Sequence, residues 1–225
     1  MTDTLITYLE EFITPERKQL FDRVIQNRTR YITVVLEDIF QPHNASAVLR
    51  SCDCFGIQDV HIIENRNKYQ VNPDVTLGSD KWLSLIKYNK QGNNSTRAIK
   101  ELRKKGYRIV ATTPHNNDTE LNNFDVSMGK IALFFGTELQ GLSEDVLQNA
   151  DEFLKIPMYG FTESYNISVS AAIILYTLTE KMKASVINWQ LTKEEMRTVR
   201  KKWLERSVRN SNLIEKEYIN KKISK

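Results

Sequence analysis

Short runs of apolar and β-branched residues alternate with longer amphipathic segments, and this alternation constrains the fold more than any other feature of the chain. The short runs have the length and composition of buried strands. We expect strands over residues 32–36, 60–63, 83–88, 107–111, 131–135 and 153–156. The spacing of apolar residues predicts helices from Asn44 to Gly56 and over residues 95–105, 143–149 and 167–182.

Strands that take turns with helices form a mostly parallel sheet that is covered by helices on both faces. Ligands of such sheets bind beyond the carboxyl ends of the strands. We therefore predict an α/β fold whose functional residues lie in the loops that follow the strands. Hydrophobic residues make up 40% of the chain and charged residues 27%, which is ordinary for a globular domain with a packed core.

Helical segments flank this alternating region on both sides. Residues 5–12 and 16–26 look helical, with Thr14 and Pro15 opening the second helix, and residues 192–209 form an amphipathic helix before a charged segment over 211–225. The predicted organisation is an N-terminal helical extension (1–30), a central α/β domain (31–183) and a basic C-terminal extension (184–225).

The net charge of +4 is unevenly distributed along the chain. Residues 181–225 hold 13 Lys or Arg against 5 acidic residues, whereas the rest of the chain is net acidic. A basic terminal segment indicates a polyanionic partner such as RNA, although a solvated helix face would have the same composition. The phosphate-binding candidates are Arg200, Lys201, Lys202 and Arg206.

Several functional classes are disfavoured. The sequence has neither the glycine-rich phosphate loop of nucleoside triphosphatases nor the dinucleotide-binding fingerprint. Cys52 and Cys54 stand without a further Cys or His cluster, so we expect reduced thiols and no metal site. With neither a long apolar run nor a signal-peptide pattern in the sequence, we expect a cytoplasmic protein that is not bound to a membrane.

Two loops after predicted strands carry unusual residues. Gly136 and Gly141 bracket the turn before a helix that Ser143 could cap, although many α/β proteins have such turns. The segment 156–168 crowds Glu, Ser and Asn side chains at the entrance of an apolar helix. Helix caps can explain one or two of these side chains, whereas several together indicate a pocket with placed hydrogen-bonding groups.

Three segments, 44–50, 136–143 and 156–170, resemble in order and spacing the signature motifs of the SPOUT RNA methyltransferases. The similarity covers about residues 34–176, and within the superfamily the chain looks like the TrmH family, whose members include the enzymes that methylate guanosine 18 of the tRNA D-loop. The resemblance implies a deep C-terminal trefoil knot, S-adenosylmethionine as cofactor, and a homodimer in which the partner chain completes each active site.

The resemblance also implies roles for individual residues. Arg50 matches the catalytic arginine of the family, and because a guanidinium is a poor base we expect it to orient the ribose hydroxyl or stabilise the alkoxide. A surface ion pair with Asp53 is the alternative role for this side chain. The surrounding polar positions are Asn44, Glu138, Ser164 and Asn166. The expected cofactor contacts are Thr113, Gly136, Ile156, Met158 and Tyr165, where Tyr165 stands at a position commonly occupied by leucine.

Further RNA contacts are expected at His43, Arg17 and Arg28. Phe21, Met196 and Trp203 are interpreted as core residues rather than stacking platforms for bases. The leading hypothesis is a tRNA guanosine 2'-O-methyltransferase acting at guanosine 18. A ribosomal RNA 2'-O-methyltransferase of the same family and a catalytically silent RNA-binding factor are the alternatives.

Overall fold

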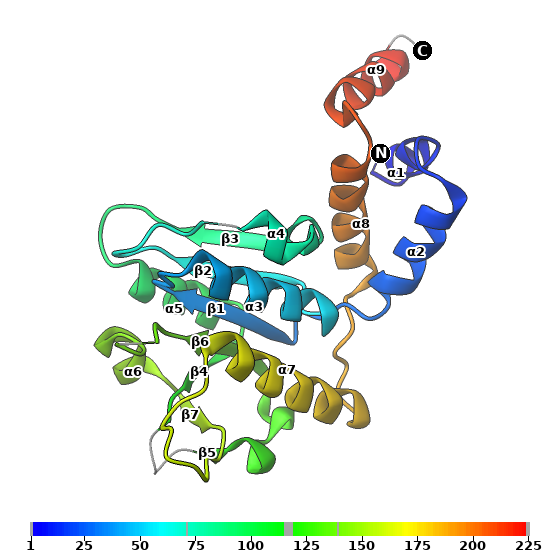
Figure 1. The fold of residues 1–225 in the computed structure, drawn as a ribbon. Helices are drawn as coiled ribbons and strands as arrows, with labels where there is room; N and C mark the ends of the chain where they lie inside the picture. Colours follow the sequence, from blue (N-terminus) through cyan, green and yellow to red (C-terminus); the bar gives the residue numbers. More distant parts are fainter. Residues whose placement is uncertain (1, 71, 115–118, 139, 224–225) are drawn as a thin grey trace. The chain divides into compact units, whose positions relative to one another are not determined.

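The computed structural model describes residues 2–70, 72–114, 119–138 and 140–223. These residues form two compact units, one built from residues 29–189 and the other from residues 1–28 together with 190–225 (Figure 1). The sequence analysis treated the two ends of the chain as separate extensions, whereas the structure joins them in one helical unit.

A parallel sheet forms the centre of the larger unit, and every strand pair in the described residues is parallel. The order across this seven-stranded sheet is β3-β2-β1-β6-β4-β7-β5. The strands are β1 Ile32–Glu37, β2 Asp59–Ile63, β3 Ser84–Tyr88, β4 Tyr107–Thr112, β5 Thr119–Glu120, β6 Lys130–Phe135 and β7 Glu152–Lys155. All six predicted strands are confirmed, and the short β5 is an addition.

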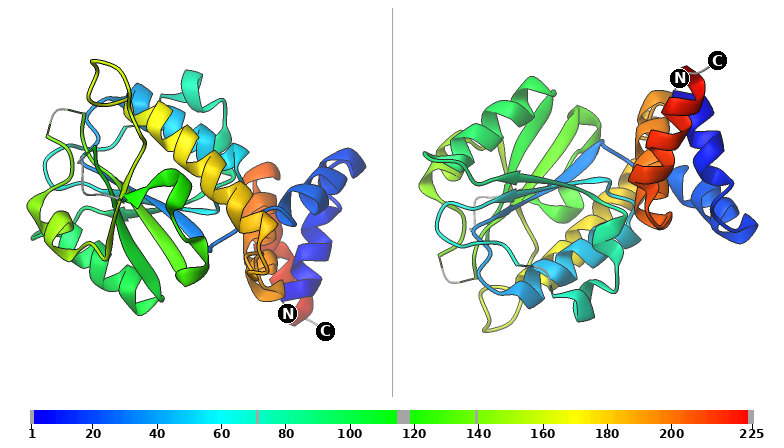
Figure 2. Two further views of the ribbon diagram at one scale, coloured as in Figure 1. Left: turned by 90° about the horizontal axis from the view of Figure 1, so that it is seen from below. Right: turned by 90° about the horizontal axis from the view of Figure 1, so that it is seen from above.

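Helices cover both faces of this sheet (Figure 2). Helices α3 (Pro42–Cys54) and α7 (Ile167–Ala184) pack against each other on one face, and α5 (Asn94–Lys104) and α6 (Glu144–Asn149) lie on the other. Helix α3 begins two residues before the predicted Asn44, because Pro42 occupies its first turn, where a missing N–H costs nothing. The connections contain α4 (Pro73–Thr76), η1 (Ser79–Lys81), η2 (Leu121–Asn123) and η3 (Val126–Met128).

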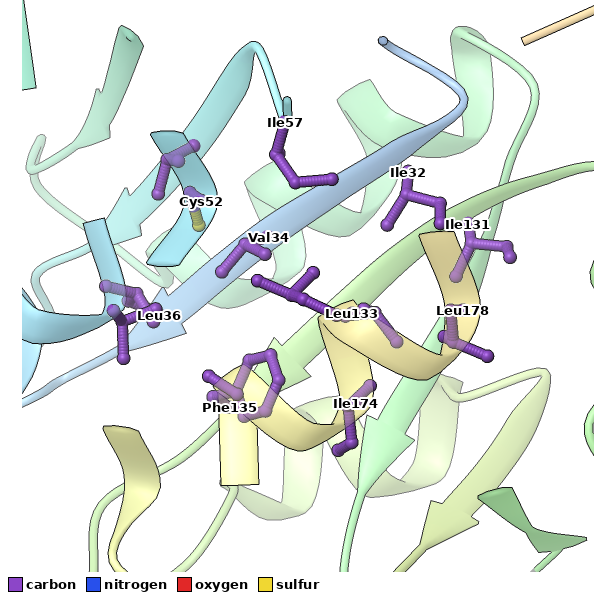
Figure 3. Packing of buried hydrophobic residues seen from close by; sticks show 14 of the residues in the cluster. Ile32, Val34, Leu36, Cys52, Ile57, Ile131, Leu133, Phe135, Ile174 and Leu178 are labelled. Carbon is purple, nitrogen blue, oxygen red and sulfur yellow. The ribbon is translucent and has the colours of Figure 1, made fainter. Parts of the chain in front are cut away.

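The core consists of two apolar layers separated by the sheet. Successive side chains of a strand point to opposite faces, so Val34 of β1 packs under α3 and α7 whereas Val35 packs under α5. Figure 3 shows the first layer, in which Leu133 of β6 lies beside Val34 of β1 and Ile174 of α7 lies near Phe135. Burial on both faces explains why the strands read as continuous apolar runs rather than alternating ones.

The smaller unit is a group of helices: α1 (Thr2–Glu10), α2 (Pro15–Ile25), α8 (Lys193–Ser207) and α9 (Ser211–Ile223). The rings of Phe21 and Trp203 pack 5.3 Å apart in its interior, which confirms their interpretation as core residues. Thr192 and Glu195 form a capping box at the start of α8, so two backbone N–H groups that a helix start leaves open are satisfied.

No helix among the described residues is both long enough and apolar enough to span a bilayer.

A buried histidine, His61, lies in β2, outside the three motif segments. His61 is 2% exposed, and its Nδ1 lies 3.0 Å from the hydroxyl of Tyr88 on β3. Burial, with a smaller contribution from the charge of Lys105, lowers the pKa of His61 from 6.5 to about 3. The folded protein therefore holds this imidazole neutral over a range in which the unfolded chain protonates it.

His61 makes the fold sensitive to acid. Because its pKa is lower in the folded state than in the unfolded state, stability falls as the pH drops below about 6.5 towards 3. In denaturant titrations between pH 7 and 4, we expect His61→Gln to flatten the slope of unfolding free energy against pH by up to about 1.4 kcal/mol per pH unit. Tyr88→Phe keeps the histidine buried and should retain the wild-type slope. Equal slopes for wild type and His61→Gln would contradict this assignment.

Candidate active site

Three segments that are distant in sequence meet at the carboxyl ends of the central strands. Asn44 in the first turn of α3 donates to Glu138 Oε1 over 2.7 Å, and Asn166 at the start of α7 donates to the same oxygen over 2.7 Å. The Asn166 amide also donates to Asn44 Oδ1 over 3.2 Å. One carboxylate oxygen thus joins residues from all three motif segments.

Asn166 is oriented by its position as the N-cap of α7. Its side-chain oxygen accepts hydrogen bonds from the backbone N–H of Ser168 (2.9 Å) and from the Ser168 hydroxyl (2.6 Å). An N-cap residue satisfies an otherwise open N–H in this way. With the oxygen engaged by the helix, the amide nitrogen is left to face Glu138.

The loop after β6, residues 136–143, is closed on itself. Thr137 and Gly141 exchange backbone hydrogen bonds of 3.0 and 2.9 Å. A Cβ atom on Gly136 would lie 2.2 Å from the carbonyl group of Gly141, closer than any real contact. Only glycine fits position 136, so the sequence signal of two glycines in this turn has a steric reason.

Beside this loop lies a cavity of about 410 Å³, bounded by the segments that follow β4, β6 and β7. These strands are neighbours in the sheet, so the segments that follow them share one edge. Apolar side chains such as Leu154, Ile156 and Ile174 form one part of the wall, and polar groups such as Glu163 and Ser164 form another. All five residues predicted to contact a cofactor line it, namely Thr113, Gly136, Ile156, Met158 and Tyr165.

The catalytic candidates are divided between the cavity and its surroundings. Glu138 and Ser164 line the cavity, whereas Asn44 and Asn166 join it through the Glu138 carboxylate. Arg50 does not line it. Its side chain is exposed on α3, without a hydrogen-bond or ion-pair partner among the residues that the structure describes. The alternative ion pair with Asp53 is therefore not formed.

Glu37, at the end of β1, is a structural element of the site that the sequence analysis did not single out. Its buried carboxylate accepts hydrogen bonds from the backbone N–H (2.8 Å) and the hydroxyl (2.7 Å) of Ser143, and from the hydroxyl of Ser95 at the start of α5. A carboxylate directly after a buried strand was the available signal. Glu37 fixes the end of the glycine loop to the sheet.

Four of the seven RNA-binding candidates have exposed side chains: His43 on α3, Arg17 on α2, and Lys202 and Arg206 on α8. The structure brings Arg17, Lys202 and Arg206 into the helical unit, and His43 into the α/β unit.

The other three candidates, Arg28, Arg200 and Lys201, have contacts within their own unit. Arg28 is 1% exposed and lies over the ring of Trp203. Arg200 forms ion pairs with Glu10 and Asp22, both at 2.5 Å.

Lys201 is held by two acidic side chains of the same unit, with Nζ 3.0 Å from Glu205 and 3.6 Å from Glu215. The hydrogen bond to Glu205 raises the pKa of Lys201 above its usual value. These contacts hold all three cations within the helical unit.

Within the described part of the chain, no group of three or more His, Cys, Asp or Glu side chains is placed to hold a metal ion. Cys52 of α3 is buried in the core, and Cys54 is exposed at the end of the same helix.

Comparison with known proteins places this geometry among RNA methyltransferases. The tRNA (guanosine(18)-2'-O)-methyltransferase of Borreliella burgdorferi is 47% identical over 210 residues, which cover 93% of this chain and 94% of that protein. The crystal structure of the A. aeolicus TrmH/SpoU tRNA modifying enzyme matches with a TM-score of 0.75 and 29% identity, covering 87% of this chain and 98% of that one.

A third match shares the fold at lower identity. The SpoU methyltransferase AviRb from Streptomyces viridochromogenes, solved in complex with AdoMet, has a TM-score of 0.60 and 24% identity, over 73% of this chain and 65% of that one. Residues 31–176 match the SpoU rRNA Methylase family. This span contains the parallel sheet, the cavity and all three motif segments, and the chain therefore belongs to the SpoU methylase family.

Proposed function

We propose that this protein transfers a methyl group from S-adenosylmethionine to the ribose 2'-hydroxyl of guanosine 18 in tRNA. The observation that carries the proposal is the cavity beside the glycine loop, which is lined by all five expected cofactor residues and adjoins the Asn44–Glu138–Asn166 cluster. The Borreliella relative, which is named for this reaction, supports the choice of substrate.

The cavity suits S-adenosylmethionine in size and chemistry. A volume of about 410 Å³ lies within the ordinary range for small-molecule sites. The apolar wall with Ile156 and Met158 would take the adenine, and glycine at position 136 lets the loop fold against Gly141 at the edge of the cavity. When bound, the cofactor supplies an electrophilic sulfonium methyl group.

The residues of the chain would position the ribose and stabilise the negative charge that develops on its 2'-oxygen. These residues would hold the 2'-hydroxyl oxygen facing the methyl donor, and the hydroxyl proton would pass to solvent. We assign to Arg50 the orientation of this hydroxyl and the stabilisation of negative charge developing on its oxygen. A base role is unfavourable because a guanidinium stays protonated at any physiological pH.

The remaining family properties belong to the same proposal. We propose that the C-terminal part of the α/β unit is tied in a deep trefoil knot, that the protein acts in the cytoplasm, and that it is a homodimer whose partner chain completes each site. Val169 and Tyr176 are exposed apolar side chains two turns apart on one side of α7, and this placement supports the dimer because apolar side chains that gather on one surface mark an interaction site. Light scattering tests the expected mass of two chains.

The reaction itself is tested with an unmodified tRNA transcript and methyl-labelled S-adenosylmethionine, followed by nuclease digestion and mass spectrometry of the nucleosides. We expect label in 2'-O-methylguanosine, and none when the transcript carries 2'-deoxyguanosine at position 18. Transfer to ribosomal RNA but not to tRNA would move the substrate while keeping the chemistry. Binding of RNA without transfer to either would instead identify a catalytically silent factor.

Gly136→Ala should impair cofactor binding, because the new Cβ collides with the Gly141 carbonyl group and displaces the loop. We expect calorimetry to give at least about a tenfold weaker Kd for S-adenosylmethionine. The matched control is Gly160→Ala, whose Cβ meets nothing within 4 Å. An unchanged Kd for folded Gly136→Ala would show that this loop does not hold the cofactor.

Arg50→Lys and Arg50→Ala should both reduce kcat about 100-fold, the usual effect of losing one donor to a developing oxyanion. Lysine keeps the charge but lacks the planar set of donors. The Kd for S-adenosylmethionine should not change, since Arg50 does not line the cavity. Arg103→Lys, on α5 at the opposite sheet face, is the matched control. Wild-type turnover by Arg50→Ala would remove Arg50 from the mechanism.

A further inference from the structure

An aromatic side chain stands exposed beside the candidate site. Phe40 lies in the short connection between β1 and α3, and 75% of its side chain is exposed. Its ring stacks on no other ring among the residues that the structure describes. Phe40 also does not line the cavity beside the glycine loop, so the proposed cofactor site does not account for it.

The connection that carries Phe40 is held firmly at its base. Asp38 has a positive φ of 53°, a conformation that costs energy for a residue with a side chain and persists only where its surroundings enforce it. The Asp38 carboxylate accepts hydrogen bonds from the backbone N–H groups of Asn65 (2.7 Å) and Arg66 (2.9 Å). Asn67 Nδ2 donates to the Asp38 carbonyl over 2.7 Å. The exposed ring therefore stands on an ordered backbone.

Phe40 is adjacent in the chain to the polar cluster of the site. The next residue, Gln41, accepts a hydrogen bond of 3.0 Å from the Asn44 amide, which also donates to Glu138. The backbone that carries the Phe40 ring thus leads directly into the residues that we expect to surround the reacting ribose.

Two cations lie on the second segment that Asp38 holds. Arg66 and Lys68 have exposed side chains, and Arg66 Nη1 donates to Gln140 Oε1 of the glycine loop over 2.8 Å. A rigid exposed aromatic side chain next to cations is the combination with which proteins hold unpaired nucleotides, because bases stack on the ring and phosphates contact the charges. The positive charge favours a polyanion over an apolar protein partner.

We infer that Phe40 is a stacking platform for an unpaired base of the RNA substrate next to the methylated ribose, and that Arg66 and Lys68 contact the adjoining phosphates. This inference rests on the proposed function and adds a substrate-positioning surface to it. Stacking on a preordered ring requires little further ordering of the protein. It also requires the base to be out of a helix, which restricts the substrate to a loop or an opened stem.

The test compares Phe40→Leu with Phe40→Trp in the full-length protein, using an unmodified tRNA transcript as the probe. Leucine keeps apolar character but has no π face, so we expect about a tenfold weaker Kd for the transcript and a correspondingly higher KM. Tryptophan keeps the stacking face and should retain wild-type affinity. The Kd for S-adenosylmethionine and the mass in solution should be the same for all three proteins.

A second pair of variants tests the cations. Lys68→Gln should lower the slope of log Kd against log salt concentration by about 1, the change expected when one phosphate contact is lost. Lys100→Gln on α5 makes the same charge change and should leave the slope as in the wild type. Equal slopes for the two variants would remove Lys68 from the RNA surface.

Two results would overturn the role of Phe40. Wild-type affinity of Phe40→Leu for the transcript would exclude stacking, and a changed mass or cofactor Kd in that variant would identify Phe40 as a dimer or folding contact instead. Methyl transfer by the wild-type protein is measured separately. If Phe40→Leu binds the transcript like the wild type while the wild type still transfers methyl groups, the role of Phe40 fails and the proposed function stands. If the wild-type protein transfers no methyl group to RNA, the proposed function itself fails.

Discussion

Parallel pairing of the central strands is the constraint on which the candidate site depends. Because β1, β6, β4 and β7 are neighbours that run in one direction, their carboxyl ends lie along one edge of the sheet. The segments that follow these strands are thereby brought together, although up to 122 positions separate Asn44 from Asn166. The backbone hydrogen bonds between the strands fix the position of that edge, and the side-chain contacts of the site depend on it.

Two carboxylates then determine how the glycine loop sits on this edge. Glu37 is buried and holds the end of the loop through Ser143, whereas Glu138 belongs to the loop and joins it to Asn44 and Asn166. A buried carboxylate is costly unless it is hydrogen-bonded, and the donors around Glu37 meet this requirement. The steric fit of Gly136 against Gly141 adds a third restraint. Three restraints therefore hold the described residues of the loop beside the cavity.

The helical unit shows how differently the basic residues of one segment are placed. Arg200 and Lys201 are among the basic residues that gave the C-terminal segment its charge, and both are paired with acidic groups of their own unit. Lys202 and Arg206 of the same helix stay exposed. The difference between paired and exposed basic residues depends on which face of α8 packs inward. The sequence alone indicates that face only through the positions of its apolar residues.

The sequence by itself determined the alternation of strands and helices, the two-sided burial of the sheet, the glycines of the loop and the polar residues of the motif segments. These features are local, because strand and helix periods and turn requirements act over a few neighbouring residues. Only the tertiary structure decided that Glu37 holds Ser143, that Arg28 lies buried over Trp203, and that Asp38 orders the connection carrying Phe40. Each of these contacts joins residues far apart in the chain, and their pairing follows from how the elements pack rather than from any spacing along the sequence.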